Sequence, residues 1–374
     1  MKLRSLPLSG YFALLFCALP GAILLLTACG KQGAESTSPT PAKPIVSTFV
    51  GDADCKECHK KEIEAHQNTR HAHALRLVND ERMKGDMPAA GDLAGTPFQW
   101  EKLPNGYGFG LANEASRPMH LAFGSGKSGI AFLAAMGNEG MAEAHLSYYP
   151  PLRKWFVTPG QASLPPNTPG NLINREGALQ CLGCHTSTVP ENTLLPEEKL
   201  LGVRCESCHG AGSIHIDAMR RKDKAADNYE KMGTWGAGKL NDACGRCHRT
   251  AKDVETKSLD RTLTDKFQGF GISQSKCFQK SGDKLSCIVC HDPHTDTPQK
   301  SSPYIAACLR CHSVGGSSST AKPALMQSKI CPVNAKDDCI KCHMPLRSRP
   351  LFEGSPRRIA DHFIHIERNK DKPQ

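Results

Sequence analysis

Cysteine and histidine recur together along this chain at one fixed spacing. The 374 residues include 18 Cys and 16 His, and most of the cysteines lie in seven copies of Cys-x-x-Cys-His, numbered here motif 1 to motif 7 in chain order. The motif cysteines are Cys55 and Cys58, Cys181 and Cys184, Cys205 and Cys208, Cys244 and Cys247, Cys287 and Cys290, Cys308 and Cys311, and Cys339 and Cys342. The motif histidines are His59, His185, His209, His248, His291, His312 and His343.

This spacing suits one kind of chemistry. Two thiols add to the two vinyl groups of one haem, and the histidine that follows binds the iron as its proximal ligand. A disulfide framework has no reason to place histidine after every second cysteine, and zinc needs two cysteine pairs or a pair with two well-spaced histidines. The sequence therefore predicts seven covalently attached haems of type c.

Nine histidines remain as candidate distal ligands, which is enough for a second histidine on every iron. They are His66, His71, His73, His120, His145, His215, His294, His362 and His365. Iron held by two histidines favours outer-sphere electron transfer, because the axial ligands leave no position for a substrate.

Spacing narrows some of these candidates. His294 follows His291 too closely to reach the other face of the same iron, so we expect it to serve a neighbouring haem, and His215 follows motif 3 in a similar way. If residues 56–79 form one helix, His59, His66 and His73 share a stripe and His71 points elsewhere.

The N-terminal segment has the features of an export signal. Lys2 and Arg4 precede an apolar stretch, and Leu26-Thr27-Ala28-Cys29 resembles a bacterial lipoprotein signal in which Cys29 becomes the acylated N-terminus. An uncleaved anchor is the alternative. We expect a signal peptide at 1–28, a flexible tether at 29–48 and an extracytoplasmic lipoprotein of the periplasm or outer membrane. In that oxidising compartment Cys277 and Cys331 form either one disulfide or two free thiols.

The basic charge does not indicate a nucleic-acid surface. Lys and Arg exceed Asp and Glu by 47 to 37, giving a formal charge of +10. Haem propionates would offset most of that excess. The expected partners are other redox proteins or quinol-linked donors, with the membrane reached through Cys29 and no nucleic acid.

Composition also bears on the fold. A hydrophobic fraction of 39% with 3 Trp is low for a core of side chains alone. Porphyrins would fill the interior, so we predict a mainly α fold with long loops and a haem-packed core. The expected parts are a first-haem helical segment at 49–83, a small β-rich insert without haem at 84–174, and a six-haem region at 175–374.

Within the insert, aromatic residues alternate with polar ones at Phe98 and Trp100 and at Tyr107 and Phe109, which predicts short hairpins. Residues 146–157 predict a further strand pair, either a lid over haem edges or a docking surface. The glycine-rich run at 124–128 lacks the spacing of a phosphate loop and is interpreted as a turn.

Four segments resemble the cytochrome c-554-type multihaem c-type cytochromes. CKECHKKEIEAHQNTRHAHAL maps His71 as a distal ligand, with Thr69 where serine is usual, and GVRCESCHGAGSIH maps His215, with Ala211 in place of proline. LSCIVCHDPH maps His294, and CIKCHMP with the later ADH maps His362. The resemblance spans residues 49–368 and implies a mostly helical, haem-stacked structure and periplasmic electron transfer. Some relatives keep one five-coordinate haem.

The expected function is electron transfer along seven mostly bis-histidine haems, and no catalytic residue is assigned. The rival is an oxidoreductase that acts on a small nitrogen or sulfur compound at one open haem. Every motif ends in histidine and the spare histidines exceed the need, which counts against the rival.

Overall fold

The computed structural model describes residues 46–189, 191–255, 264, 267–312, 331, 338–348 and 358–366, and these ranges contain all seven motifs. The predicted signal peptide and Cys29 lie outside the described residues. Among the helices described, none combines the length and the apolar character that crossing a membrane requires.

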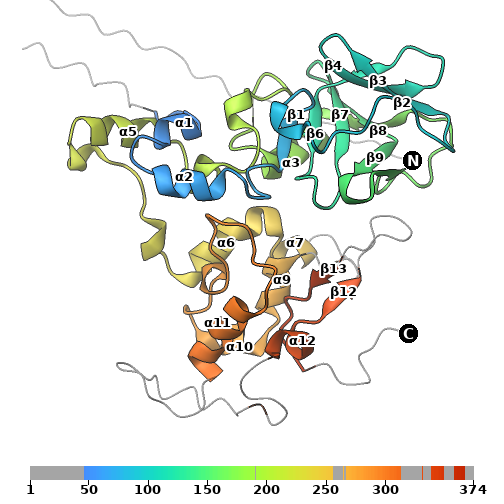
Figure 1. Cartoon of the computed structure of the whole chain (residues 1–374). Helices are drawn as coiled ribbons and strands as arrows, with labels where there is room; N and C mark the ends of the chain where they lie inside the picture. The colour runs from blue at the N-terminus through green and yellow to red at the C-terminus, as the bar shows by residue number, and fades with distance from the viewer. Residues whose placement is uncertain are drawn as a thin grey trace, which may run out of the picture. The chain divides into compact units, whose positions relative to one another are not determined.

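Strands between motifs 1 and 2 form two antiparallel sheets and a hairpin (Figure 1). The five-stranded sheet has the order β1 (Leu75–Leu77), β6 (Leu121–Phe123), β7 (Ala131–Met136), β8 (Gly140–Ala144) and β11 (Gly170–Asn174). The four-stranded sheet consists of β2 (Gly91–Asp92), β3 (Phe98–Leu103), β4 (Gly106–Leu111) and β5 (Arg117–Met119). The hairpin pairs β9 (Leu146–Tyr149) with β10 (Lys154–Val157).

These strands enclose an aromatic core of their own. Trp100 is fully buried, and its ring lies 4.5 Å from that of Phe132, 5.2 Å from Tyr107 and 5.4 Å from Trp155. The alternation in β3 places Phe98 and Trp100 on the buried face, as a strand with a period of two requires. The pairing of β3 with β4 and of β9 with β10 confirms the two hairpins expected at these positions.

The expected mainly α fold is wrong, since the described residues hold several sheets as well as helices. The physical reason is that residues 78–155 contain enough large apolar side chains to close a core without porphyrin. The strands also begin earlier than predicted, at Leu75, within the segment that was expected to be helical.

The helices of the described residues are short, and most stand at or beside a motif. They are α1 (Asp52–Cys55), α2 (Lys60–His66), α3 (Arg175–His185), α4 (Cys205–His209), α5 (Ser213–Arg220), α6 (Ala237–His248), α7 (Ala251–Glu255), α9 (Gln268–Ser273), α10 (Lys276–Ser281), α11 (Ser302–His312) and α12 (Cys339–His343). A last strand pair, β12 (Leu346–Ser348) with β13 (Arg358–Ala360), follows motif 7.

The chain after motif 1 does not continue as a helix. α2 ends at His66, and the backbone then turns, with the Ala72 N–H donating to the Thr69 hydroxyl at 3.2 Å. The single helical stripe expected for His59, His66 and His73 is therefore not formed. This turn redirects the chain into β1, so that His71 lies between the first motif and the sheets.

The helix of motif 2 joins the sheets to the haem motifs. α3 packs on β8 and β11, where Leu182 and Ala178 are fully buried with Leu75 and Leu121. Fully burying a leucine side chain contributes about 1.5–3 kcal/mol, so this apolar contact fixes motif 2 firmly on the sheet.

Candidate functional site

Each motif is folded as one helical turn. α4 and α12 are the motifs themselves, and α3, α6 and α11 end in theirs. Motifs 1 and 5 make the same turn, with the N–H of His59 bonded to the carbonyl of Cys55 at 2.9 Å and that of His291 to Cys287 at 3.0 Å. Residues i, i+3 and i+4 share one face of a helix, so both thiols and the imidazole of a motif face the same side.

Four motif histidines each face the ring of a second histidine from a distant part of the chain. The ring centres are 6.4 Å apart for His59 and His215, 6.3 Å for His209 and His294, 6.1 Å for His291 and His362, and 6.0 Å for His248 and His71. All four second histidines are those predicted as distal ligands. The structure therefore brings each of these four histidines to a motif other than the one beside it in the sequence.

This spacing fits a haem iron between the two rings. Metal–imidazole bonds of about 2 Å on opposite sides of one ion place the two ring centres roughly 6 Å apart. A direct ring stack is closer, as in the 4.5 Å between His215 and Tyr229. With two thiols beside each motif histidine, the donor set suits haem c.

Hydrogen bonds at the other ring nitrogen orient several of these imidazoles. His215 Nδ1 lies 2.9 Å from Asp227 Oδ1, His362 Nδ1 lies 3.0 Å from the Ala360 carbonyl, and His248 Nδ1 lies 3.1 Å from Gln268 Oε1. A metal-binding histidine usually donates its second N–H in this way, which leaves Nε2 directed at the metal.

Burial keeps many of the histidines neutral. It lowers the pKa of His209, His291 and His362, and burial together with the nearby His248 lowers the pKa of His71 to about 4. Neutral imidazole is the form that binds a metal. These side chains are therefore in the ligating form at neutral pH.

Two polar side chains form hydrogen bonds that hold the segments containing His362 and His294 in place. The hydroxyl of the fully buried Ser275 donates to the His362 carbonyl at 3.2 Å and accepts the Ile364 N–H at 2.8 Å, which fixes the His362 segment on the end of α9. Asp296, just after His294, accepts the Arg70 N–H at 3.1 Å and the Lys127 ammonium at 3.1 Å.

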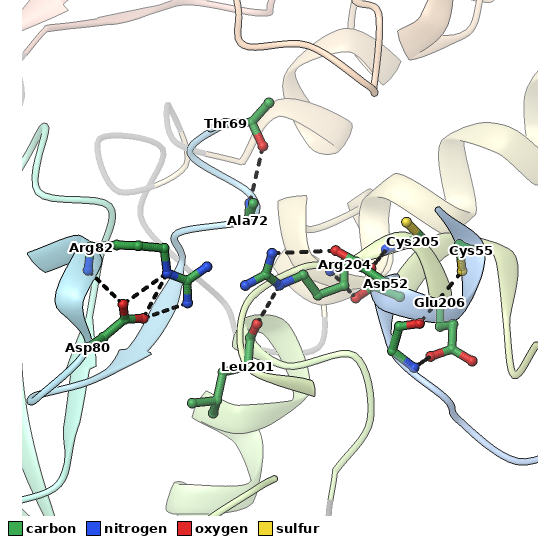
Figure 2. Close-up of polar contacts among 12 residues, drawn as sticks. Asp52, Cys55, Thr69, Ala72, Asp80, Arg82, Leu201, Arg204, Cys205 and Glu206 are labelled. Carbon is green, nitrogen blue, oxygen red and sulfur yellow. Dashed lines mark hydrogen bonds and ion pairs between the residues drawn. The ribbon is translucent and has the colours of Figure 1, made fainter. Parts of the chain in front are cut away.

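The region between motifs 1 and 3 has a buried carboxylate at its centre (Figure 2). Glu206, 2% exposed, accepts the backbone N–H groups of Val50 at 3.0 Å, Gly51 at 2.8 Å and Gly212 at 2.8 Å. Arg204 donates to the Leu201 carbonyl at 2.8 Å and to Asp52 at 3.4 Å. These bonds fix the start of α1 on motif 3.

Segments that belong to different motifs also meet. The Cys205 N–H of motif 3 donates to Asp52 in α1 at 3.3 Å, Cys184 Sγ of motif 2 lies 3.9 Å from the Arg246 carbonyl of motif 4, and the Cys287 N–H of motif 5 donates to Asn241 in α6 at 2.9 Å. α11 packs against α12, and the His291 ring lies 5.5 Å from Tyr304 in α11. The Arg246 guanidinium of motif 4 donates to the Ser207 carbonyl of motif 3 at 2.5 Å, so the seven motifs form a contiguous network.

Motif 2 differs from the four paired motifs. His185 Nδ1 bonds to the Ala74 carbonyl at 2.9 Å, and its ring lies 5.0 Å from Phe123. Within the described ranges, no second histidine ring pairs with His185, His312 or His343.

The remaining candidates have other surroundings. His120 Nδ1 accepts the Ala135 N–H of β7 at 3.0 Å, so its proton lies on Nε2. This histidine therefore takes part in the hydrogen bonding of the sheet. The buried His145 lies 5.2 Å from Phe98 in the aromatic core. His365 Nδ1 bonds to the Phe363 carbonyl at 2.6 Å. His66 and His73 each have one buried ring nitrogen without a partner among the described residues.

Cys277 is half-buried in α10, and the choice between a disulfide with Cys331 and two thiols stays a prediction. The residues after Cys331, at 332–337, lie outside the described part. The sequence analysis did not identify Asp227, Asp296 or Ser275, because none stands at a spacing from a motif histidine that would mark its role. It did not identify Glu206 because this residue occupies a variable position of motif 3.

Comparisons with known proteins found one matching family model and one similar curated protein. The family model described as "Cytochrome c554 and c-prime" matches residues 54–96 and 168–210. The dissimilatory sulfite reductase MccA of Wolinella succinogenes is 23% identical over 79% of this chain and 50% of that protein. The chain thus spans about half the length of this relative.

Two solved structures align with most of this chain at low sequence identity. The outer cell wall cytochrome OcwA aligns with a TM-score of 0.49 at 15% identity over 84% of this chain and 79% of its own. An undecaheme cytochrome from the S-layer of Carboxydothermus ferrireducens aligns with a TM-score of 0.45 at 13% identity over 87% and 53%. The repeated motifs and the histidine pairs lead to one conclusion: this chain is a multihaem c-type cytochrome, and its residues 54–96 and 168–210 are similar to the family described as "Cytochrome c554 and c-prime".

Proposed function

We propose that the chain is a heptahaem c-type cytochrome lipoprotein that carries electrons outside the cytoplasm along mostly bis-histidine haems. The observation that carries the proposal is the set of four histidine pairs with ring centres 6.0–6.4 Å apart. Bound haem c supplies a one-electron iron couple. The chain's own part would be to hold the group between two histidines, which would exclude substrate, and to hold neighbouring centres together.

The contacts between motifs support a continuous route. Asp52 beside motif 1 accepts the Cys205 N–H of motif 3, Arg246 of motif 4 donates to the Ser207 carbonyl of motif 3, and Cys184 of motif 2 lies 3.9 Å from the Arg246 carbonyl. The Cys287 N–H of motif 5 donates to Asn241 in α6. Because each contact joins the segments of two motifs, the attachment points of neighbouring haems would lie near one another. The proposed route links motif 1 to motif 3, motif 3 to motif 4, and motif 4 to motifs 2 and 5, with motifs 6 and 7 continuing beyond.

The test begins with the haem count and the ligation of the purified holoprotein. We expect intact mass and the pyridine haemochrome to give seven haems, and EPR of the oxidised protein to be dominated by low-spin iron. His294→Ala should open the iron of motif 3, producing one high-spin centre that binds carbon monoxide after reduction. His120→Ala is the matched control and should change neither signal. If H294A remains low-spin and does not bind carbon monoxide, the proposed pairing is wrong.

The membrane anchor is tested separately. Cys29→Ser should release the cytochrome from membranes into the soluble extracytoplasmic fraction without changing its haem content. Membrane association that survives in C29S would contradict the lipoprotein proposal. Other redox proteins or quinol-linked donors are the proposed partners of the anchored protein.

A specific observation favours a second candidate function, an oxidoreductase acting on a small nitrogen or sulfur compound. His185 faces Phe123 rather than a second histidine in the described structure, and the relative MccA is named a dissimilatory sulfite reductase. If motif 2 leaves its iron open, wild-type protein should bind carbon monoxide at one haem, and sulfite or nitrite should reoxidise the reduced protein. Failure of both would leave electron transfer alone.

A further inference from the structure

One distal histidine has a carboxylate directly behind it. Asp227 Oδ1 lies 2.9 Å from His215 Nδ1, and the same oxygen accepts the Tyr229 N–H at 3.0 Å. Both side chains of the pair are largely sheltered, at 21% and 22% exposure. The contact is therefore short, fixed by a second hydrogen bond and only partly screened by water.

The other distal histidines have weaker partners at this position. His362 Nδ1 faces the neutral carbonyl of Ala360 at 3.0 Å. His294 Nδ1 lies 3.4 Å from Asp292, but these side chains are 47% and 59% exposed, so solvent screens the charge. Of the distal contacts that the structure describes, the one at His215 is the closest to a full carboxylate–imidazole pair.

The loop that carries Asp227 is itself fixed. The Tyr229 ring stacks on His215 with centres 4.5 Å apart and planes 12° from parallel, and its hydroxyl donates to the Gly210 carbonyl at 2.7 Å. Gly210 directly follows motif 3, so the loop is hydrogen-bonded to the end of motif 3, whereas His215 itself faces His59 of motif 1. The plane of the His215 ring and its tautomer are both determined by these contacts.

A carboxylate that accepts the second N–H of an imidazole makes the ring a stronger electron donor to its metal. Stronger donation and the nearby negative charge stabilise the oxidised form of the iron. We propose that Asp227 is a positioning residue that holds the reduction potential of the His59–His215 centre below those of the other three histidine-paired centres. This inference rests on the proposed ligation of motif 1 by His59 and His215.

The consequence is a direction for electron flow. A low potential at motif 1 makes this centre a donor to motif 3, whose Cys205 N–H donates to Asp52 beside motif 1 at 3.3 Å. Electrons would then enter at motif 1 and pass toward motifs that lie later in the chain. A neutral residue at position 227 would remove this bias.

The experiment is a redox titration of the full holoprotein followed by EPR and absorbance. His215→Ala identifies the low-spin signal of motif 1, because that signal should be lost. In the wild type we expect this signal to be the last of the four to disappear on reduction. Asp227→Asn should raise its reduced-to-oxidised ratio at a fixed potential at least tenfold, which corresponds to about 59 mV for one electron. Asp227→Glu should restore the low potential.

Asp223→Asn is the matched control. Asp223 lies in the same loop and accepts the Ala225 and Ala226 N–H groups at 3.2 and 3.3 Å, so its loss should leave the potential of motif 1 unchanged. An unshifted potential in a fully loaded D227N protein would overturn the role of Asp227 while leaving the ligation intact. If H215A removes no low-spin signal, the ligation itself fails. If D227N loses haem, the wild type alone decides. The inference is then refuted if the motif 1 signal of the wild type is not the last of the four to be reduced.

Discussion

Removal of the Glu206 carboxylate should loosen the junction between motifs 1 and 3. Glu206 is 2% exposed and accepts three backbone N–H groups at 2.8–3.0 Å, from Val50, Gly51 and Gly212 (Figure 2). In Glu206→Ala these donors lose their acceptor in a buried position. The first turn of the haem region, α1, should then separate from α4 more often than in the wild type.

The expected size follows from the contacts. A hydrogen bond to a charged group contributes about 1.5–3 kcal/mol, and the three bonds are not additive because water enters the space left by the side chain. We expect the local opening free energy to fall by about 3 kcal/mol. At about 1.4 kcal/mol for each factor of ten, amide exchange at these positions should accelerate by roughly a hundredfold.

Hydrogen exchange with mass spectrometry of the oxidised holoprotein measures this directly in peptides covering residues 48–52 and 210–214. Glu206→Gln keeps one acceptor oxygen and should give a smaller acceleration. Glu62→Ala, on the exposed face of α2, is the matched control and should have no effect at these amides. Wild-type exchange rates in E206A, with all haems retained, would refute the reasoning.

Three further predictions concern the sheets and their contact with the motifs. In apo protein, hydrogen exchange should show protected amides in the strands of residues 98–149 and freely exchanging amides in the haem motifs, because the strands have their own core. Loss of protection in both regions would contradict this. Trp100→Ala should destabilise those strands by about 3–5 kcal/mol, measured as faster strand exchange, with haem spectra unchanged. Gly202→Ala should displace the segment beside His71, because Gly202 has a φ of +85° and a Cβ there would overlap the Ala72 carbonyl. EPR should then show an altered His71–His248 centre. Gly85→Ala is the control, since the space around Gly85 is open and the EPR signal should not change.

The haem motifs could be predicted from the sequence because their residues lie within one helical turn. Cys55, Cys58 and His59 act together because one helical turn aligns them, and this holds for each motif regardless of the rest of the chain. The hairpin at Phe98 and Trp100 was also predictable, since alternation over a few residues already selects the buried face. Both features depend on neighbours within a few positions.

The fold class was not predictable in this way. Low overall hydrophobicity suggested that porphyrins fill the interior, but the apolar residues are concentrated in the segment around Trp100 and Phe132, where they close a core without haem. An average over the whole chain hides such a local concentration. The same averaging concealed β1, which begins where a helix was expected.

By itself the sequence predicted haem c as the cofactor, the motif histidines as its proximal ligands and the histidines available as distal partners. Only the tertiary structure decided that His71 faces His248 and that His362 faces His291, because these pairings depend on packing between segments far apart in the chain. Ser275 and Asp227 contribute to that packing without standing at any recognisable spacing from a motif. Ligand identity is thus a local property of this chain, whereas ligand pairing arises only when distant segments pack together.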